Sequence, residues 1–422
     1  MLHGRTLGAA GFRYRLGRGR LVLVAAGKAA SAMAREAERI LGTALSQSLC
    51  VDVSDRIPLA RTRRLIAGHP VPDEAGRRAA DEVEALARGL GADDLLLLLI
   101  SGGASALLPA PVEGLTLDDK ARTTSVLLRA GTAIGELNAV RKHLSRLKGG
   151  GLARAAAPAR IACLALSDVV GDEPSTIASG PAAADPTTYA TALEVLDRKG
   201  VREMVPAAVR RHLEAGAQGE RPETPKPGDP LFRRVAFSVV GSNRLSLAAA
   251  AVEARRQGMR PLVLTTRLEG EAREVARALV AVLRECVEEG RPAAPPACLL
   301  AGGETTVTVT GGGRGGRNQE LVVAAAEPLA DFPVAALVAS LATDGIDGDS
   351  DAAGGVADSS TLARAEALGL APPSAFLAEN DSRSFLGPLG DLLVTGPTGT
   401  NVMDLTALVA GGRARRRRSR LL

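Results

Sequence analysis

The chain has 422 residues, of which 46% are hydrophobic and only 2% are aromatic. This length can bury a large core and predicts two domains, while the scarcity of aromatic side chains excludes a base-stacking surface for nucleic acid. The net charge is +5, but six arginines lie in the last ten residues, and subtracting them leaves the body near −1. The sequence therefore predicts no nucleic-acid partner, and we expect residues 411–422 to form a disordered basic tail.

The four cysteines, Cys50, Cys163, Cys286 and Cys298, are isolated and lie in or beside apolar segments. No C-x-x-C pattern occurs, so we expect reduced core residues of a cytoplasmic protein. The longest strongly apolar run, at 95–100, is far too short to cross a membrane, and the N-terminus has no signal-type apolar segment. The sequence therefore predicts no membrane partner.

Near the N-terminus, a strand, a tight loop and a helix follow one another. Residues 21–25 are apolar and predict a buried strand, and a helical pattern runs to about residue 41. Lys28 stands at the start of this helix, where the helix dipole disfavours a positive charge unless an anion is bound. Lys28 is therefore a candidate phosphate ligand, with a solvated lysine as the alternative. The loop is not a P-loop, because the required glycine and Ser/Thr positions are not matched.

The clearest core strand is expected at 94–100, where the residues are apolar on both faces. It leads into Ser101, Gly102, Gly103 and Ser105, whose amides and hydroxyls are placed to hold a small anion at the carboxyl end of the strand. No histidine lies nearby to activate a serine, and the G-x-S-x-G pattern is absent. We therefore expect Ser101 and Ser105 to bind substrate rather than to attack it.

A helix expected at 137–147 is followed by a run of three glycines. Arg141 and Lys148 are seven residues apart, so they share a face of the helical pattern. A basic face beside a substrate loop can hold a carboxylate, and this makes Arg141 a candidate substrate ligand. A solvated basic face is the alternative.

Two carboxylates, Asp168 and Asp172, follow another buried strand expected at 161–166. Carboxylates just past a strand end can bind Mg²⁺ or accept a proton from an attacking hydroxyl. Capping of the turn is the alternative explanation for one of the two.

Residues 215–230 are rich in glycine, proline and charge, which is typical of a linker. They predict an N-terminal domain at 1–224 and a C-terminal domain at 225–422. Further strands are expected at 48–53, 235–240, 261–265, 334–340 and 391–395. Further helices are expected at 74–88 and 117–134, from 243 to 257, and at 269–289.

The most unusual stretch lies at 301–320. Residues 304–310 are rich in Thr and Val and predict a strand, five of the six residues at 311–316 are glycine, and a helix opens at Arg317. This arrangement presents backbone N–H groups and the positive end of a helix to a phosphate, and Arg314 and Arg317 add positive charge. A flexible surface hairpin is the alternative.

The repeated alternation of strands and helices predicts an α/β fold with mainly parallel sheets in two domains. Loops at the carboxyl ends of strands gather at one crevice in such sheets. Lys28, the Ser101 loop and Asp168 are expected in the first crevice, and Arg317 and Asp344 in the second. The simplest architecture faces the two crevices across a cleft. The aspartates near Asp344 do not form a calcium loop, because the spacing and the closing Glu are missing.

Several motifs, taken in order, resemble those of the glycerate 2-kinases. They are AGKAA at 26–30, GHPVPDEAG at 68–76, SGGASAL at 101–107, LSDVVGD at 166–172, IASGP at 177–181, GGET at 302–305, GGRNQE at 315–320 and TDG at 343–345. The C-terminal half resembles the MOFRL domain of that family. The resemblance covers about residues 21–408, and the ordered set is far more specific than any one motif.

The resemblance implies a Rossmann-like N-terminal domain, a smaller α/β MOFRL domain, and phosphorylation of D-glycerate at its 2-hydroxyl with ATP and Mg²⁺. The residues matching Lys28 and Arg317 are the proposed catalytic cations of the family. The substrate is expected to contact Ser101, Gly102, Gly103, Ser105 and Arg141. The nucleotide is expected at Gly302, Gly303, Glu304, Thr305, Gly315, Gly316 and Asn318. Metal ligands are expected among Asp168, Asp172 and Asp344, with Asp168 also a candidate catalytic base.

Two other functions remain open. Some family members have been named hydroxypyruvate reductases, and Gly311-x-Gly-x-x-Gly316 formally matches the dinucleotide-binding fingerprint. The match is weak, because a run of glycines satisfies many patterns and the expected strand before it is polar-alternating rather than buried. A non-catalytic anion sensor could use the same loops. The sequence is compatible with a monomer or a homodimer.

Overall fold

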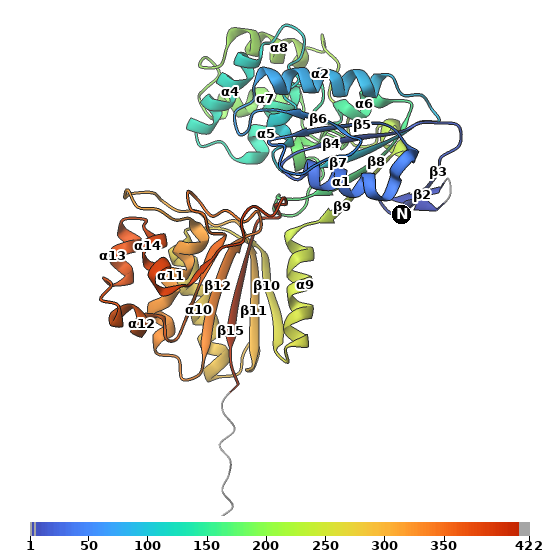
Figure 1. Ribbon diagram of the computed structural model, residues 1–422. Helices are drawn as coiled ribbons and strands as arrows, with labels where there is room; N and C mark the ends of the chain where they lie inside the picture. The colour runs from blue at the N-terminus through green and yellow to red at the C-terminus, as the bar shows by residue number, and fades with distance from the viewer. Residues whose placement is uncertain (1, 4–5, 413–422) are drawn as a thin grey trace, which may run out of the picture. The chain divides into compact units, whose positions relative to one another are not determined.

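A computed structural model describes residues 2–3 and 6–412, with side chains from residue 6 onward. The chain divides into two compact units, Met1–Val240 and Gly241–Leu422, drawn from blue to green and from yellow to red in Figure 1. Residues 413–422, which make up most of the predicted basic tail, lie outside the described residues. No helix in the described part of the chain is both long and apolar enough to cross a bilayer.

The first unit is built on a six-stranded sheet whose order is β6-β5-β4-β7-β8-β9. Its strands are β4 (Leu21–Ala26), β5 (Leu45–Asp52), β6 (Arg63–Ile66), β7 (Leu95–Ile100), β8 (Arg160–Leu166) and β9 (Val235–Gly241). The pairings from β6 to β8 are parallel. Numbered along the chain, the order is 3-2-1-4-5-6, that of a doubly wound dinucleotide-type fold. The expected Rossmann-like topology is therefore present.

Helices pack on both faces of this sheet, as the two apolar clusters on either side of β4 and β7 require. The helices of the unit are α1 (Ala30–Leu41), α2 (Glu74–Arg88), α3 (Ala104–Leu107), α4 (Leu117–Arg129), α5 (Ile134–His143), α6 (Gly151–Ala156), α7 (Tyr189–Arg198) and α8 (Ala207–Ala217), of which α4, α5, α7 and α8 form an apolar cluster of their own. Three short antiparallel strands, β1 (Leu2–His3), β2 (Thr6–Ala9) and β3 (Phe12–Arg15), precede the main sheet. The sequence pattern is too weak over these short strands to indicate them.

The boundary between the units differs from the prediction at 224/225. Residues up to Val240 belong to the first unit, because β9 is the edge strand of its sheet. The Pro-rich segment before β9 is also fixed there. Glu223 accepts a hydrogen bond from the Tyr189 amide at 2.9 Å, and the Thr224 hydroxyl donates to Asp185 at 2.9 Å. Glycine and proline correctly indicate an irregular segment, but tertiary contacts decide to which unit it belongs.

Acidification is expected to destabilise this segment through Asp185. Burial alone would raise the pKa of Asp185, but Lys142, Thr187 and His143 hold the pKa below its ordinary value. The stabilisation is therefore present above the ordinary pKa of about 3.8 and is lost as pH falls through the lower folded pKa. Asp185→Asn should lower the free energy of unfolding by about 2 kcal/mol at neutral pH and should flatten its fall below about pH 4. Urea unfolding from pH 7 to pH 3 measures both effects, and equal pH slopes in the two proteins would contradict the assignment.

The second unit has a six-stranded sheet of order β10-β11-β15-β12-β13-β14. Its strands are β10 (Arg260–Leu268), β11 (Ala297–Gly303), β12 (Ala336–Ala342), β13 (Gly354–Asp358), β14 (Leu392–Leu393) and β15 (Asp404–Ala410). Only β10 and β11 pair in parallel, whereas β15 is antiparallel to both of its neighbours. The expectation of a mainly parallel sheet is therefore wrong for this unit, because the chain returns from beyond β14 to insert its last strand in the middle.

The second sheet also corrects the strand expected at 304–310. The strand is the fully buried β11, which ends at Gly303, and the Thr/Val-rich residues after it form only an isolated bridge between Thr306 and Glu271. β propensity suited residues 304–310, but the apolar run before them makes the core contacts. The strand that precedes the glycine run is therefore buried, and its polarity does not argue against a dinucleotide site.

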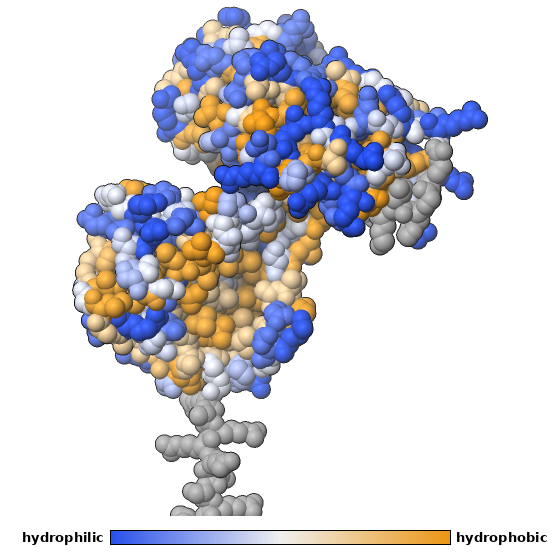
Figure 2. All heavy atoms as spheres, viewed as in Figure 1, coloured by the Kyte–Doolittle hydropathy of each residue, from blue (hydrophilic) through white to orange (hydrophobic). Residues whose placement is uncertain are grey.

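Helix α9 (Asn243–Arg256) packs on one face of this sheet, and α10 (Ala272–Glu288) and α11 (Arg317–Ala330) pack on the other (Figure 1). Three further helices extend the α11 side: α12 (Thr361–Ala367), α13 (Pro373–Ala378) and α14 (Ser382–Leu389). Beyond α9, the sheet face carries half-buried apolar residues such as Leu337 and Leu341, and it is apolar in Figure 2. The four cysteines are buried and free, as expected.

Candidate functional site

The strand order of the first sheet places its topological switch point between β4 and β7. Ligands of doubly wound sheets bind outside the carboxyl ends of the strands at this point. The loops that follow the two strands are joined there by hydrogen bonds. The Lys28 amide donates to the Gly102 carbonyl at 2.8 Å, and the Ala29 amide donates to the Ser101 hydroxyl at 3.0 Å. The predicted Lys28 and Ser101 loops are therefore adjacent.

The Lys28 side chain is exposed at the centre of this arrangement. No carboxylate among the described residues pairs with its ammonium group. Gly103 has a φ of +86°, and a Cβ there would lie 3.2 Å from the Lys28 Cγ and 3.1 Å from the His69 ring. Burial, together with the charge of Lys28, lowers the pKa of His69, so this ring favours the neutral form. His69 thus lies beside the candidate catalytic lysine.

Asp168 approaches the same loop from the end of β8. A Cβ on Gly102 would lie 1.8 Å from the Asp168 Oδ2, so only glycine permits this approach. Asp172 lies at the end of the turn, where its amide donates to the Val169 carbonyl and its φ is +57°. The structure therefore brings Asp168 to the loops that carry Lys28 and Ser101.

Gly102→Ala is expected to displace the Asp168 carboxylate and to lower the catalytic rate by about 10²-fold, because a misplacement of about 1 Å has this cost. The matched control is Gly135→Ala in α5, where a Cβ would meet nothing within 4 Å. Steady-state kinetics and a thermal melt of each variant check the result. Equal rates in the two variants would show that Asp168 does not need its present position.

Ser105 and Arg141, predicted as substrate ligands, are in direct contact. The Arg141 Nη2 donates to the Ser105 Oγ at 2.8 Å, and this oxygen lies 2.8 Å from the Ser179 Oγ. Ser179 in turn donates to the Asn138 Oδ1 at 3.2 Å. Sequence reasoning missed Ser179 and Asn138 as members of this group. The signals were the IASGP motif and the helical spacing of three between Asn138 and Arg141.

Two buried lysines donate hydrogen bonds to backbone carbonyls of the Ser101–Ser105 loop and of the residues that follow it. The Lys148 Nζ donates to the Ser105 carbonyl at 2.7 Å and to the Leu108 carbonyl at 3.2 Å, and the Lys120 Nζ donates to the Pro109 carbonyl. Burial, and then nearby positive charges, lower the pKa of both lysines well below the ordinary value. Within the described residues neither lysine has a carboxylate partner. The alternative of a solvated basic face is therefore wrong for Lys148.

In the second unit, Arg317 is the first residue of α11 and is held by two carboxylates. Its Nε and Nη2 bind the two oxygens of Asp404 at 2.5 and 3.0 Å, and its Nη1 lies 2.9 Å from Glu304. Burial alone would lower the pKa of Arg317, but the hydrogen bonds and charges of these partners raise it, so Arg317 stays charged. Glu304, predicted at the nucleotide, is an ion-pair partner of Arg317, and Asp404 was missed.

The N-terminus of α11 is already occupied by a carboxylate of the chain itself. Asp347 Oδ1 accepts from the Asn318 amide and side chain, both at 3.1 Å, and Oδ2 accepts from the Gln319 amide at 2.9 Å. The Asn318 Oδ1 accepts from Ser340 at 2.6 Å. The prediction that this helix end presents free amides to a phosphate is therefore wrong, since an internal anion has taken them. A nucleotide contact by Asn318 stays a prediction.

The glycine loop at 311–316 is likewise bonded within the unit. The amides of Gly311, Gly313 and Gly315 donate to the Asn380 Oδ1, the Glu379 carbonyl and the Asp349 Oδ1 at 2.9–3.0 Å. Its glycines allow close backbone packing, because a Cβ on Gly311 or Gly316 would lie within 2.4 Å of a neighbouring residue. The alternative of a flexible hairpin is therefore wrong too.

The remaining predicted nucleotide residues lie at the end of β11. A Cβ on Gly302 would fall 2.0 Å from the Asn243 Oδ1, and one on Gly303, whose φ is +151°, would fall 2.3 Å from Leu268. Thr305 is buried. Their contacts, and those of Gly315 and Gly316, with a nucleotide stay predictions.

The candidate metal ligands do not converge on a complete protein site. Asp168 and Asp172 lie in the first unit, whereas Asp344 lies in the second, where its Oδ1 accepts from the Ile346 amide at 3.2 Å. The described residues contain no group of three or more His, Cys, Asp or Glu that could hold a metal ion. Mg²⁺ is commonly held by one or two carboxylates together with substrate phosphates, so Asp168 and Asp172 fit such an ion in their number and oxygen chemistry.

Two protein-family models match the chain, one in each unit. Residues 4–214 match the family described as "Domain of unknown function (DUF4147)", and residues 297–404 match the MOFRL family. The glycerate 2-kinase of Pyrococcus horikoshii is 41% identical over 409 residues, which cover 94% of this chain and 89% of that protein. The D-glycerate 2-kinase of Thermotoga maritima is 40% identical over 390 residues, covering 92% and 89%.

The chain belongs to the glycerate 2-kinase family.

The crystal structure of the glycerate kinase from Thermotoga maritima has a TM-score of 0.86 to this chain at 40% identity, covering 93% of this chain and 92% of that one. A relative from Agrobacterium vitis that carries a hydroxypyruvate reductase name is 43% identical over 396 residues, covering 93% and 88%. The geometry of this glycerate 2-kinase family member disfavours the dinucleotide fingerprint. Residues 304–310 separate the end of β11 from the glycine run, whereas the fingerprint requires the glycines directly after the strand.

Proposed function

We propose that this chain transfers the γ-phosphoryl group of ATP to the 2-hydroxyl of D-glycerate, giving 2-phosphoglycerate and ADP. The single observation that carries the proposal is the group of residues at the switch point of the first sheet. There the exposed Lys28, the Ser101 loop and Asp168 come together, while the relatives named as glycerate 2-kinases supply the reaction. Phosphoryl transfer depends on positioning and charge stabilisation, which this group can provide.

Binding of the substrate carboxylate falls to the Ser101–Ser105 loop and to Arg141. Arg141 is positively charged, contacts Ser105, and is not neutralised by any carboxylate of the described chain. Burial lowers the pKa of Arg141, and an incoming carboxylate offsets this cost by restoring an ion pair. Lys148 fixes the backbone of Ser105 and so acts as a positioning residue.

In the chemical step the 2-hydroxyl oxygen bonds to the γ-phosphorus while the bond from that phosphorus to the β,γ-bridging oxygen breaks. Asp168 accepts the hydroxyl proton. Lys28 stabilises the charge on the transferring group, as the cations of other kinases do. With Asp168 as the base, Asp172 is the carboxylate left to hold Mg²⁺, which would neutralise the charge of the ATP phosphates. A catalytic role for Arg317 is a prediction, and so is a role for Asp344 at a metal. We place the enzyme in the cytoplasm, in keeping with its buried, free cysteines.

A coupled ADP-release assay with D-glycerate, ATP and Mg²⁺ tests the proposal beside NADH oxidation with hydroxypyruvate. We expect ADP release that requires D-glycerate, and phosphorus NMR should identify the 2-phospho product. NADH oxidation without ADP release would replace the kinase by the reductase. If neither ADP release nor NADH oxidation is observed while D-glycerate binds tightly, the anion sensor would be favoured.

A further inference from the structure

A cavity of about 450 Å³ lies in the first unit, away from the loop that carries Lys28. Its walls come from the C-terminal end of α2, the region from α5 to α6, the helices α7 and α8, and the segment at 221–225. This volume is within the range of small-molecule sites. The lining contains six basic side chains, Arg88, Lys142, Arg146, Lys148, Arg154 and Arg221, and a single carboxylate, Glu84.

The positive charge in the lining is only partly neutralised. Glu84 is shared between Arg88 and Arg146, with oxygen–nitrogen distances of 2.6 and 2.7 Å. Arg154 donates to the backbone carbonyl of Glu223 at 2.5 Å rather than to a carboxylate. Arg221 is exposed and has no hydrogen-bond partner among the described residues. An anion entering the cavity would therefore meet at least two guanidinium groups that have no carboxylate of their own.

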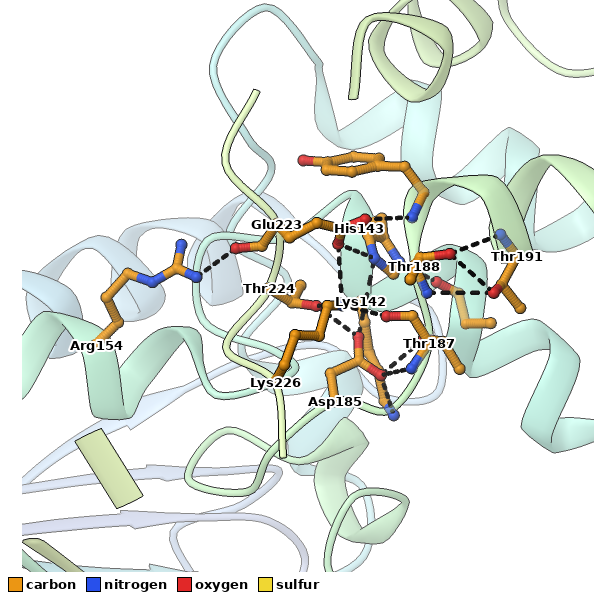
Figure 3. A network of polar contacts seen from close by, with 12 residues as sticks. Lys142, His143, Arg154, Asp185, Thr187, Thr188, Thr191, Glu223, Thr224 and Lys226 are labelled. Atoms are coloured by element: carbon orange, nitrogen blue, oxygen red, sulfur yellow. Dashed lines mark hydrogen bonds and ion pairs between the residues drawn. The ribbon is translucent and has the colours of Figure 1, made fainter. Parts of the chain in front are cut away.

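The wall formed by the segment at 221–225 is fixed before any ligand arrives. In Figure 3, Asp185 receives bonds from Lys142 and Thr224, and Glu223 pairs with His143 and Lys226. Lys142 and Asp185 are almost completely buried, at 4% and 0% side-chain exposure, so their pair is rigid and poorly screened. Because the carboxylates of Asp185 and Glu223 already pair with other residues of this network, they do not neutralise Arg154 and Arg221. These two guanidinium groups are therefore available to a ligand in the cavity.

Two polar groups in the lining lack partners among the described residues. The His212 Nε2 lies 2.9 Å from the His143 carbonyl and must donate to it, so the Nδ1 is an acceptor in the neutral ring. This Nδ1 is buried without a partner, and His212 is only 5% exposed. The Tyr189 hydroxyl makes no hydrogen bond to any described residue. A buried polar atom without a partner is costly, and a ligand hydroxyl would satisfy the Nδ1.

We propose that this cavity is a second ligand site, separate from the substrate loop, for a small phosphorylated hydroxy acid. Its phosphate and carboxylate would meet Arg154 and Arg221, and its hydroxyl would meet His212. Helix α5 separates the two sites. Arg141 contacts Ser105, whereas His143, two residues later and about 200° further round the helix, lines the cavity. Lys148 links the two through its bonds to Ser105 and Leu108.

Calorimetric titration of the full chain with 3-phosphoglycerate tests this site. We expect the Arg154→Gln/Arg221→Gln variant to bind at least about tenfold more weakly than the wild type, because two charged hydrogen-bond donors are removed. Lys28→Ala should retain this binding, since Lys28 belongs to the other site. Arg255→Gln, an exposed arginine on α9, is the matched control and should bind as the wild type does.

The titration reads heat of binding, so it remains valid if phosphoryl transfer fails to appear in the assay of the proposed function. Tyr189→Phe is a second variant that keeps the packed ring and removes only the hydroxyl, and we expect it to weaken binding several-fold. Unchanged affinity in the double arginine variant would overturn the proposal. Loss of all binding in Lys28→Ala, or no binding by the wild type at millimolar concentration, would do the same.

Discussion

Lys28→Ala is expected to lower the catalytic rate of glycerate phosphorylation by about 10³-fold with little change in the melting temperature. The size follows from the loss of one preorganised donor at the developing charge, which costs about 10²–10³-fold. Stability should be unaffected, because the ammonium is exposed and no carboxylate of the described chain depends on it. Coupled ADP release at saturating ATP and D-glycerate, together with a thermal melt, measures both quantities.

The control for this experiment is Arg35→Ala. Arg35 lies on α1, the helix that follows Lys28, is exposed, and forms no ion pair within the described residues, so its loss removes the same charge from a nearby position. Its rate should remain within about twofold of the wild type, since surface substitutions of this kind have small effects. A comparable loss in both variants would mean that the general field of the domain, and not the position of Lys28, drives catalysis.

Arg317→Ala is expected to lower both activity and stability. Its removal leaves Asp404, whose side chain is 8% exposed, without the fork that now binds both of its oxygens. Breaking such a pair costs about 3 kcal/mol, because an uncompensated carboxylate remains buried. The rate should fall by about 10²-fold or more if Arg317 also stabilises the transferring group. Urea unfolding and steady-state kinetics, both on the full chain, separate the two losses.

A second pair of variants distinguishes a catalytic Arg317 from a purely structural one. Glu304→Gln weakens the ion pair at the Nη1 of Arg317 and leaves the two bonds from Arg317 to Asp404 intact. The free energy of unfolding should therefore change by less than about 1 kcal/mol. Arg317→Lys keeps the charge but loses the fork. If Arg317→Ala destabilises the protein while the rate of the folded fraction stays at the wild-type level, the role of Arg317 is structural alone.

The candidate site of the first unit was largely predictable, because its signals are local. Each buried strand there is followed directly by its functional loop, as with residues 21–28 and 95–103, and parallel topology brings such loops to one edge without further information. The burial of the Lys148 side chain was not predictable. Its burial depends on how α5 and α6 pack, and helical spacing alone describes a solvated face equally well.

The second unit shows where local patterns fail. The glycine run and the start of α11 form the strand–loop–helix pattern of a phosphate site. Asp347 and Asp349, however, accept hydrogen bonds from its backbone amides, and they lie in a loop about 30 residues further along the chain. No sequence spacing reveals that a helix end is already satisfied by such a distant carboxylate. The mixed sheet could not be predicted for the same reason, since the position of β15 depends on long-range pairing.

The placement of β15 has a consequence for biosynthesis. Residues 404–410 fill the gap between β11 and β12, so these two strands have no common neighbour until residue 410 has left the ribosome. The sheet of the first unit needs nothing beyond β9 and can be complete while translation continues. A stop codon shortly before residue 404 would therefore release a chain whose first half is native and whose second half exposes two unpaired strand edges, the kind of surface that chaperones and proteases recognise.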